Sequence, residues 1–195
     1  MTKVKNKSMN IAVLGLFCAM TVVFQLLSYA IKIGTFNLSL VLIPIVLCAV
    51  MYGPKYGGVM GGVFGVVVVL ASVFGLDGGG NILFNASPIL TILVCMIKGI
   101  AAGVVPGFIV KAFKGRQQYV AVILAAISAP IVNTGIFVAA MFLFFKDILV
   151  SWAGGSDVVY YVIFGLVGIN FIIEFLINSV FSPVIYRVIR AVKKN

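Results

Sequence analysis

The sequence contains no histidine, which removes the side chain most often used for acid–base catalysis near neutral pH and the commonest metal ligand. Its three cysteines, Cys18, Cys48 and Cys95, lie in separate apolar runs without a Cys-x-x-Cys pair, so we expect small buried side chains there. The dipeptide Gly-Lys is absent, and with it the phosphate-binding loop of the Walker type. If transport by this protein uses ATP, another chain must hydrolyse it.

Charged residues are also scarce. They make up 9% of the 195 residues, whereas apolar residues make up 63% and the mean hydropathy is +1.26. A soluble chain needs about 25% charged residues to cover its surface. The composition therefore predicts an all-α integral membrane protein with no separate soluble domain.

Six stretches are apolar over roughly the 20 residues that a helix needs to cross the hydrocarbon of a bilayer. We expect one transmembrane domain over residues 1–195, a bundle of six transmembrane helices. The predicted spans are Met9–Ile31, Phe36–Tyr52, Lys55–Gly75, Pro88–Phe113, Tyr119–Phe145 and Val158–Ile189. A cleavable signal peptide over residues 1–30 is the alternative for the first span, and its removal would leave five.

The positions of the charges orient this bundle. The net charge is +10, from 14 basic and 4 acidic residues, and most basic residues flank the spans on one side. Asp77, Asp147 and Asp157 fall in the opposite loops. Because positive charge marks the cytoplasmic side, we expect both termini in the cytoplasm and no role for nucleic acid. The basic residues on that side are Lys3, Lys5, Lys7, Lys55, Lys111, Lys114, Arg116, Arg187, Arg190, Lys193 and Lys194.

Few strongly polar residues lie inside the predicted spans, and such residues are functional candidates because burying them in lipid is costly. At about 1.5 Å per residue, Lys98, Asn133 and Asn170 all lie about 15–18 Å below the outer ends of their spans. Glu174 follows one turn deeper on the same face as Asn170. Two interpretations stay open. Lys98 pairs with Glu174 while the asparagines bind neighbouring backbone, or Lys98 binds an anionic ligand that Asn133 and Asn170 orient.

The outer loops supply further candidates for a binding site. Asp77-Gly-Gly-Gly-Asn81 and the segment from Asn85 to Pro88 are polar and flexible, as expected of a lid or a cavity rim. Thr91 begins the fourth span nearby. Trp152, the only tryptophan, is either an interfacial anchor or a wall over the ligand. The candidate substrate-binding residues are Asn85, Thr91, Lys98, Asn133, Trp152, Asn170 and Glu174.

Small residues recur at four-residue spacing, which allows two helices to pack closely. In the third span they are Gly57, Gly61 and Gly65, accompanied by Gly58 and Gly62. This stripe predicts either packing within the bundle or a docking face. A second, shorter pattern occurs in the first span, where Gly15-xxx-Ala19 has Ala12 nearby.

With these motifs in place, the chain resembles the substrate-binding S components of energy-coupling factor (ECF) transporters. The resemblance covers the six spans, the basic cytoplasmic tail, Gly15-xxx-Ala19, Tyr52-Gly-Pro-Lys-Tyr-Gly57 with the glycine stripe, and Lys98-Gly-Ile-Ala-Ala-Gly103. It implies a protein of the prokaryotic cell membrane that is not an enzyme and needs no metal or cofactor. Such a component binds a vitamin in a cavity near the outer face, closed by outer loops.

The resemblance also implies partners and a ligand. An S component docks on a transmembrane coupling subunit and two ATPases, here through Ala12, Gly15 and Ala19, and releases its ligand inside. The stretch Pro130-Ile-Val-Asn133-Thr134, followed by the aromatic-rich residues 137–145, is similar to pantothenate-type members. Lys98, Asn133 and Asn170 would then form the floor of the cavity.

One alternative function comes from a different class of protein. A self-sufficient secondary transporter of a small anionic metabolite would use Glu174 as its proton carrier, and would need no ATP or partner chain. An enzyme acting on membrane lipids is disfavoured, because such enzymes usually need histidine, cysteine or clustered carboxylates at the interface.

Overall fold

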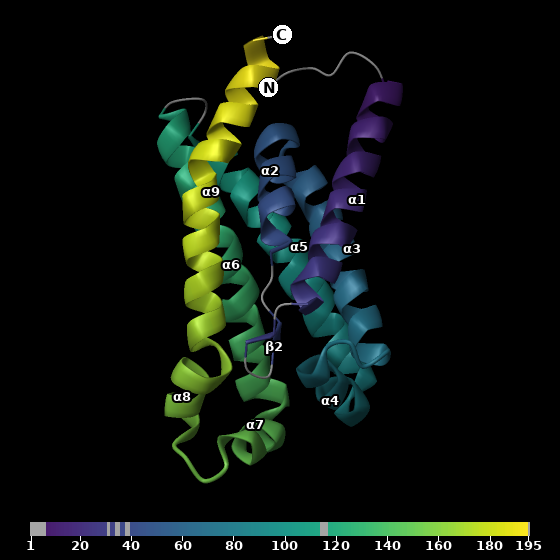
Figure 1. Cartoon of the computed structure of the whole chain (residues 1–195), viewed down its shortest axis with the longest axis vertical. Coiled ribbons are helices and arrows are strands. Elements are labelled where there is room, and N and C mark those ends of the chain that lie inside the picture. The colour runs from purple at the N-terminus through teal and green to yellow at the C-terminus, as the bar shows by residue number, and fades with distance from the viewer. Residues whose placement is uncertain (1–6, 31, 34–35, 38–39, 114–116, 195) are drawn as a thin grey trace.

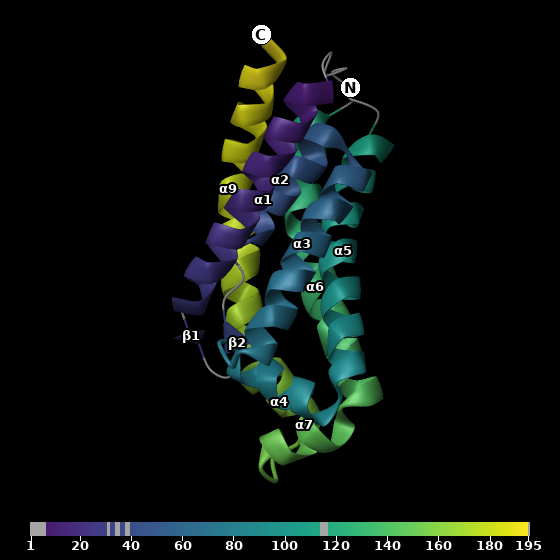
Figure 2. The same cartoon turned by 90° about the vertical axis from the view of Figure 1, so that its right-hand side faces the viewer.

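The computed structural model describes residues 7–30, 32–33, 36–37, 40–113 and 117–194. The basic residues Lys3, Lys5, Lys114 and Arg116 lie outside them. Long helices run side by side along the molecule, and short helices cap one end (Figures 1 and 2). The elements are α1 (Lys7–Ala30), β1 (Lys32–Ile33), β2 (Phe36–Asn37), α2 (Leu42–Tyr52), α3 (Pro54–Val73), α4 (Gly78–Ala86), α5 (Pro88–Ala112), α6 (Gln118–Phe144), α7 (Lys146–Ala153), α8 (Val158–Tyr160), the π-helical turn η1 (Tyr161–Leu166) and α9 (Gly168–Lys194).

The all-α membrane bundle is confirmed. Five described helices, α1, α3, α5, α6 and α9, are long and apolar enough to cross a bilayer. The start of α1 and the end of α9 lie at the same end of the bundle, and α4 and α7 lie at the other (Figure 1). We call these the cytoplasmic and outer ends, following the predicted orientation.

The prediction that Phe36–Tyr52 forms a single transmembrane helix was wrong. Phe36 and Asn37 form β2, which pairs antiparallel with β1 in the register Lys32↔Asn37 and Ile33↔Phe36. The helix that follows, α2, has 11 residues and is about 16 Å long, roughly half the hydrocarbon thickness of about 30 Å. A sixth crossing is made only if α7 and the Val158–Leu166 segment, bent by 89° from each other, count as one span.

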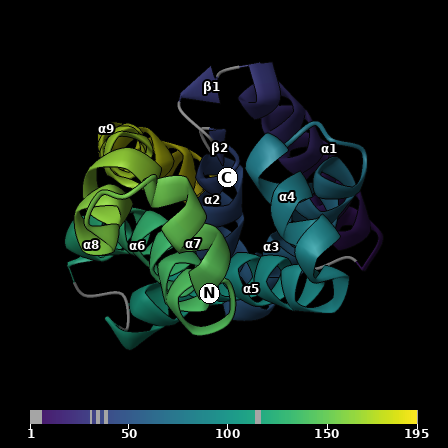
Figure 3. The ribbon, with the colours of Figure 1, turned by 90° about the horizontal axis from the view of Figure 1, so that it is seen from below.

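The half-length helix α2 is the centre of the hydrophobic core. It contacts all five long helices, which surround it when the bundle is seen from its outer end (Figure 3). Six of its 11 residues are buried, and Leu42, Ile45 and Val46 are 0% exposed. They pack in one cluster with residues such as Phe17 of α1 and Phe64 of α3. Because α2 is short, the remaining length of the bundle interior is lined by the other helices.

The closest helix contact joins α3 and α5. Added to Gly61, a Cβ atom would lie 2.7 Å from the carbonyl carbon of Gly99, and one added to Gly57 would overlap the carbonyl of Gly103. Gly107 packs in the same way against Pro54. The glycine stripe of the third span therefore serves packing within the bundle, which is the first of its two interpretations, because its face is occupied by α5.

The last predicted span, Val158–Ile189, is interrupted. Residues 161–166 form the π-helical turn η1, and α9 begins at Gly168. A Cβ at Gly168 would overlap the carbonyl oxygen of Ile163, so the chain turns where only glycine fits. A π-turn inserts an extra residue into the helical repeat and often occurs at functional sites. Here it immediately precedes the first turns of α9, which carry Asn170 and Glu174.

Substituting Gly61 by alanine tests the α3–α5 contact. We expect Gly61→Ala to lower stability by about 1–3 kcal/mol, because overpacking a close contact forces the backbones apart. Gly62→Ala is the matched control on the same helix, since its Cβ would meet Ile100 at an ordinary 3.8 Å and alanine favours helix by about 1 kcal/mol. Thermal unfolding in detergent measures both. Equal melting temperatures for the two variants would contradict this packing.

Candidate substrate-binding site

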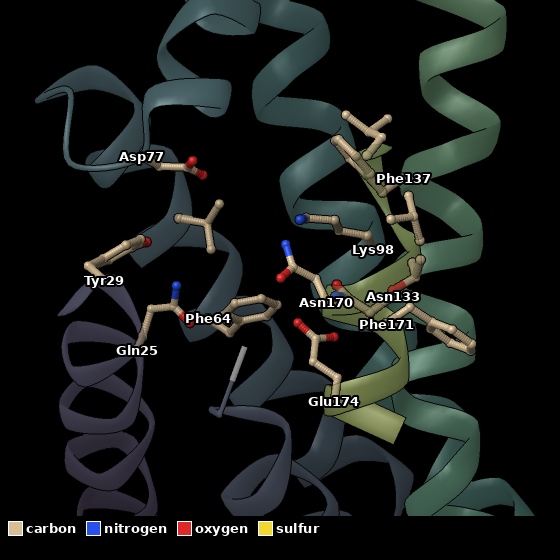
Figure 4. Close-up of a pocket in the computed structure, with 14 residues that line it drawn as sticks. Gln25, Tyr29, Phe64, Asp77, Lys98, Asn133, Phe137, Asn170, Phe171 and Glu174 are labelled. Carbon is tan, nitrogen blue, oxygen red and sulfur yellow. The ribbon is translucent and has the colours of Figure 1, made fainter. Parts of the chain in front are cut away.

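A pocket lies inside the bundle on the outer side of α2, and residues of α1, α3, α5, α6 and α9 converge on it (Figure 4). Its volume is about 70 Å³, space for about five water molecules. Pockets for drug-sized ligands begin at roughly 300 Å³, so the space in this conformation is small. The lining residues are Gln25, Tyr29, Phe64, Val68, Asp77, Lys98, Asn133, Thr134, Phe137, Leu166, Val167, Asn170, Phe171 and Glu174.

Lys98 places a cation in this pocket. Its ammonium nitrogen lies 5.2 Å from the centroid of the Phe137 ring and 5.9 Å from that of Phe64, within the range of cation–π attraction. The side chain extends into the pocket in Figure 4. The next residue, Gly99, packs against Gly61. The α3–α5 contact therefore fixes the part of α5 from which the lysine projects.

Asn133 of α6 and Asn170 and Glu174 of α9 line the pocket on the same side as Lys98. Glu174 is only 5% exposed, and its backbone carbonyl accepts a hydrogen bond from the Asn178 amide at 2.8 Å. Seen as in Figure 4, the Asn170 carboxamide lies between the Lys98 ammonium and the Glu174 carboxylate. The sequence-predicted layer of polar side chains is thus assembled from three helices around one cavity.

Two buried polar atoms of the pocket lack hydrogen-bond partners in the described part of the chain. They are Oε1 of Gln25 and Oδ1 of Asn133. Buried polar atoms are nearly always satisfied in folded proteins, so such exceptions require an explanation. Two of them in the lining of one pocket indicate a site built to bind a polar ligand or ordered water.

A second, smaller cavity of about 30 Å³ adjoins the first beneath α4. Asp77 and Lys98 line both cavities, and Thr91 lines the second. The Thr91 hydroxyl donates to the carbonyl of Ser87 at 2.9 Å, so it is already used locally. Asp77, which precedes α4, is 8% exposed. The residues that begin α4 therefore form part of the cavity wall.

The structure does not bring two of the predicted residues to either cavity. Asn85 is exposed and donates to the Asn81 side chain at 3.1 Å. Trp152 of α7 is half-buried against a cluster that includes Leu149. Their contact with a ligand stays a prediction that this conformation does not support.

Sequence reasoning missed the contribution of the first helix. Gln25 and Tyr29 line the pocket, and Gln25 is only 3% exposed. A lone amide inside the first apolar run was a signal of the same kind as Lys98, because polar side chains are costly inside a span. The aromatic walls Phe64 and Phe137 carried no such signal, since phenylalanine is common throughout these helices.

Residues 9–186 match the model of the family described as ECF transporter, substrate-specific component. The chain belongs to this family. It is therefore a multi-pass membrane protein in a family of substrate-binding transporter components, which is not a class of enzymes. A search of curated proteins found no match.

The predicted docking residues of this substrate-specific component lie on an open face of α1. Ala12, Gly15 and Ala19 are all exposed. A Cβ atom added to Gly15 would meet nothing within 4 Å. The small residues of α1 are therefore not used to pack the described bundle, unlike the glycines of α3.

Removing an unsatisfied polar atom tests the pocket's polarity. We expect Gln25→Leu to raise the stability of the ligand-free component by about 1 kcal/mol, because a buried polar group without a partner carries a desolvation cost. Ser182→Ala is the control, since that buried hydroxyl donates to the Ser179 carbonyl at 2.7 Å and its loss brings no such gain. Thermal unfolding without ligand measures both. A destabilised Gln25→Leu variant would contradict the assignment.

Proposed function

We propose that this component captures a water-soluble vitamin that carries a carboxylate, with pantothenate the best candidate, at the outer face of a prokaryotic cell membrane. It then releases the ligand to the cytoplasm when docked on the ECF coupling subunit and its two ATPases. The observation that carries the proposal is the Lys98 ammonium, which extends into a pocket inside the bundle where Oε1 of Gln25 and Oδ1 of Asn133 lack hydrogen-bond partners in the described chain.

The chemistry of the pocket favours a carboxylate near Lys98. An ammonium is a compact cation that donates up to three hydrogen bonds, and here its contacts include two aromatic faces. The nearby carboxamide of Asn133 can orient an anionic group. Pantothenate is much larger than the 70 Å³ cavity, so its binding requires an opened conformation. The short helix α4, which covers the second cavity, is the element expected to move.

Calorimetry on the purified protein tests the carboxylate. We expect Lys98→Met to weaken pantothenate binding by about 10- to 100-fold, the value of a hydrogen bond to a charged group. The uncharged alcohol analogue of pantothenate should bind the wild type weakly and be little affected by the substitution. Lys111→Met is the control, because Lys111 is exposed in the last turn of α5. Fluorescence of Trp152 would not report on the pocket directly, because Trp152 lines neither cavity.

The outcomes separate two parts of the proposal. Equal binding of pantothenate and its alcohol would remove the carboxylate argument and leave a vitamin-binding component. Wild-type affinity in Lys98→Met would have the same consequence. Absence of binding across a panel of vitamins would overturn the capture function itself.

The docking face is tested by a bulky substitution. We expect Gly15→Leu to leave folding and ligand affinity unchanged but to reduce co-purification with the coupling subunit and ATP-driven uptake by at least tenfold, because a small-residue face allows close helix approach. Gly135→Leu is the matched control, since Gly135 is exposed on α6 and also has open space around a Cβ. Equal loss in both variants would argue against a specific docking role for α1.

A second candidate function is self-sufficient secondary transport of a small anionic metabolite. The observation that favours it is the burial of the Glu174 carboxylate at the pocket, a position suited to a proton carrier. Uptake assays in vesicles that contain this chain alone distinguish the two candidate functions. Uptake driven by a proton gradient supports this candidate, whereas uptake that requires ATP and the partner subunits supports the S-component function.

A further inference from the structure

The pocket has two chemically different walls. Lys98, Asn133, Asn170 and Glu174 lie together on one side in Figure 4, whereas Asp77, Tyr29 and Gln25 lie on the opposite side, with Phe64 between the two groups. The proposed function uses only the first wall. The second wall is formed by α1 and by the residue that precedes α4.

The second wall is rich in hydrogen-bond acceptors. Oε1 of Gln25 is buried without a hydrogen-bond partner among the described residues, and the Gln25 side chain is 97% buried, since its exposed fraction is 3%. Asp77 adds a carboxylate, which only accepts hydrogen bonds when ionised. A group that satisfies Oε1 of Gln25 and the Asp77 carboxylate must donate hydrogen bonds.

The charges of the pocket point the same way. Its lining carries one basic side chain, Lys98, and two acidic ones, Asp77 and Glu174. A ligand that brings only a carboxylate adds negative charge to a pocket that already has an excess of acidic groups. A donor at the other end of the ligand offsets this, because a hydroxyl or an ammonium is attracted to Asp77.

We propose that the ligand is a carboxylate that bears a hydrogen-bond donor, either a hydroxyl or an ammonium, at the end opposite the carboxylate. The donor binds Gln25, Tyr29 and Asp77, the carboxylate binds Lys98, and an apolar middle segment packs on Phe64. This inference rests on the proposed function for the carboxylate end. It adds a requirement at the other end that the Lys98 argument does not contain.

Three probes of equal size separate the possible end groups. They are 4-aminobutanoate, 4-hydroxybutanoate and pentanoate, which differ only in an ammonium, a hydroxyl or a methyl at the end away from the carboxylate. Calorimetry measures their direct binding, and competition against pantothenate provides a second measurement. We expect at least one of the two donor-bearing probes to bind wild type about tenfold or more tightly than pentanoate, the value of one hydrogen bond to an otherwise unsatisfied acceptor.

Variants of the second wall assign the effect to named residues. Gln25→Leu should reduce the preference for donor-bearing probes to near unity and weaken pantothenate, which has hydroxyl groups, by about tenfold. Asp77→Asn should weaken 4-aminobutanoate more than 4-hydroxybutanoate, because it removes the negative charge that attracts an ammonium but leaves an oxygen that accepts from a hydroxyl. Thr21→Val is the control, because Thr21 is also buried on α1 with an unpartnered hydroxyl in the described structure but does not line the pocket.

The results distinguish this inference from the function on which it rests. If pentanoate binds as tightly as the donor-bearing probes, or if Gln25→Leu binds pantothenate like the wild type, the donor requirement is overturned. The capture function then still stands where Lys98→Met weakens every carboxylate. If none of the three small probes binds, the affinity of the Gln25→Leu variant for pantothenate is the test of the donor requirement. If no carboxylate binds at all, the proposed function and this inference fall together.

Discussion

The contact between α3 and α5 is the constraint on which the other features depend. Backbone meets backbone there, with Gly61 against Gly99 and Gly57 against Gly103, and side chains would not fit. Close approach of this kind provides van der Waals contact in a lipid environment, where burial of apolar surface gives helices little reason to associate. It also holds Lys98 and Phe64, which neighbour these glycines in sequence, at a fixed separation across the pocket. The helix pair is thus both the most tightly packed part of the bundle and the frame of the binding site.

The short length of α2 is the second feature that determines where the pocket lies. A full-length helix in the middle of five others would fill the bundle from end to end. Instead α2 packs its 11 residues into part of the interior, and its neighbours supply polar side chains where it is absent. The interrupted last span works with this arrangement, since η1 and the break before Gly168 bring Leu166 and Asn170 to the cavity. Irregular backbone is tolerated inside a membrane protein where it lines a cavity instead of facing lipid.

Much of this was predictable from composition and spacing. Hydropathy identified the long helices, and the cost of polar groups in lipid singled out Lys98, Asn133, Asn170 and Glu174, which do line one pocket. Hydropathy failed at Phe36–Tyr52 because it measures polarity without conformation, and a strand followed by a short buried helix is as apolar as one span. Hydropathy also did not predict the break in the last span at residues 161–168, because a π-turn has no distinct apolar period. Asp77 was predicted in a flexible lid or cavity rim, but only the three-dimensional arrangement reveals that it lines the same cavity as Lys98 and directly precedes a helix, α4.

The burial of α2 has a consequence for the barrier function of the membrane. Val41, directly before α2, and Leu42, Ile45, Val46 and Cys48 within it are 0% exposed, so the part of the interior that α2 fills is dry and apolar. Close packing of apolar side chains excludes water and ions from that part of the interior. In this conformation α2 therefore forms an apolar barrier in the part of the bundle that it occupies.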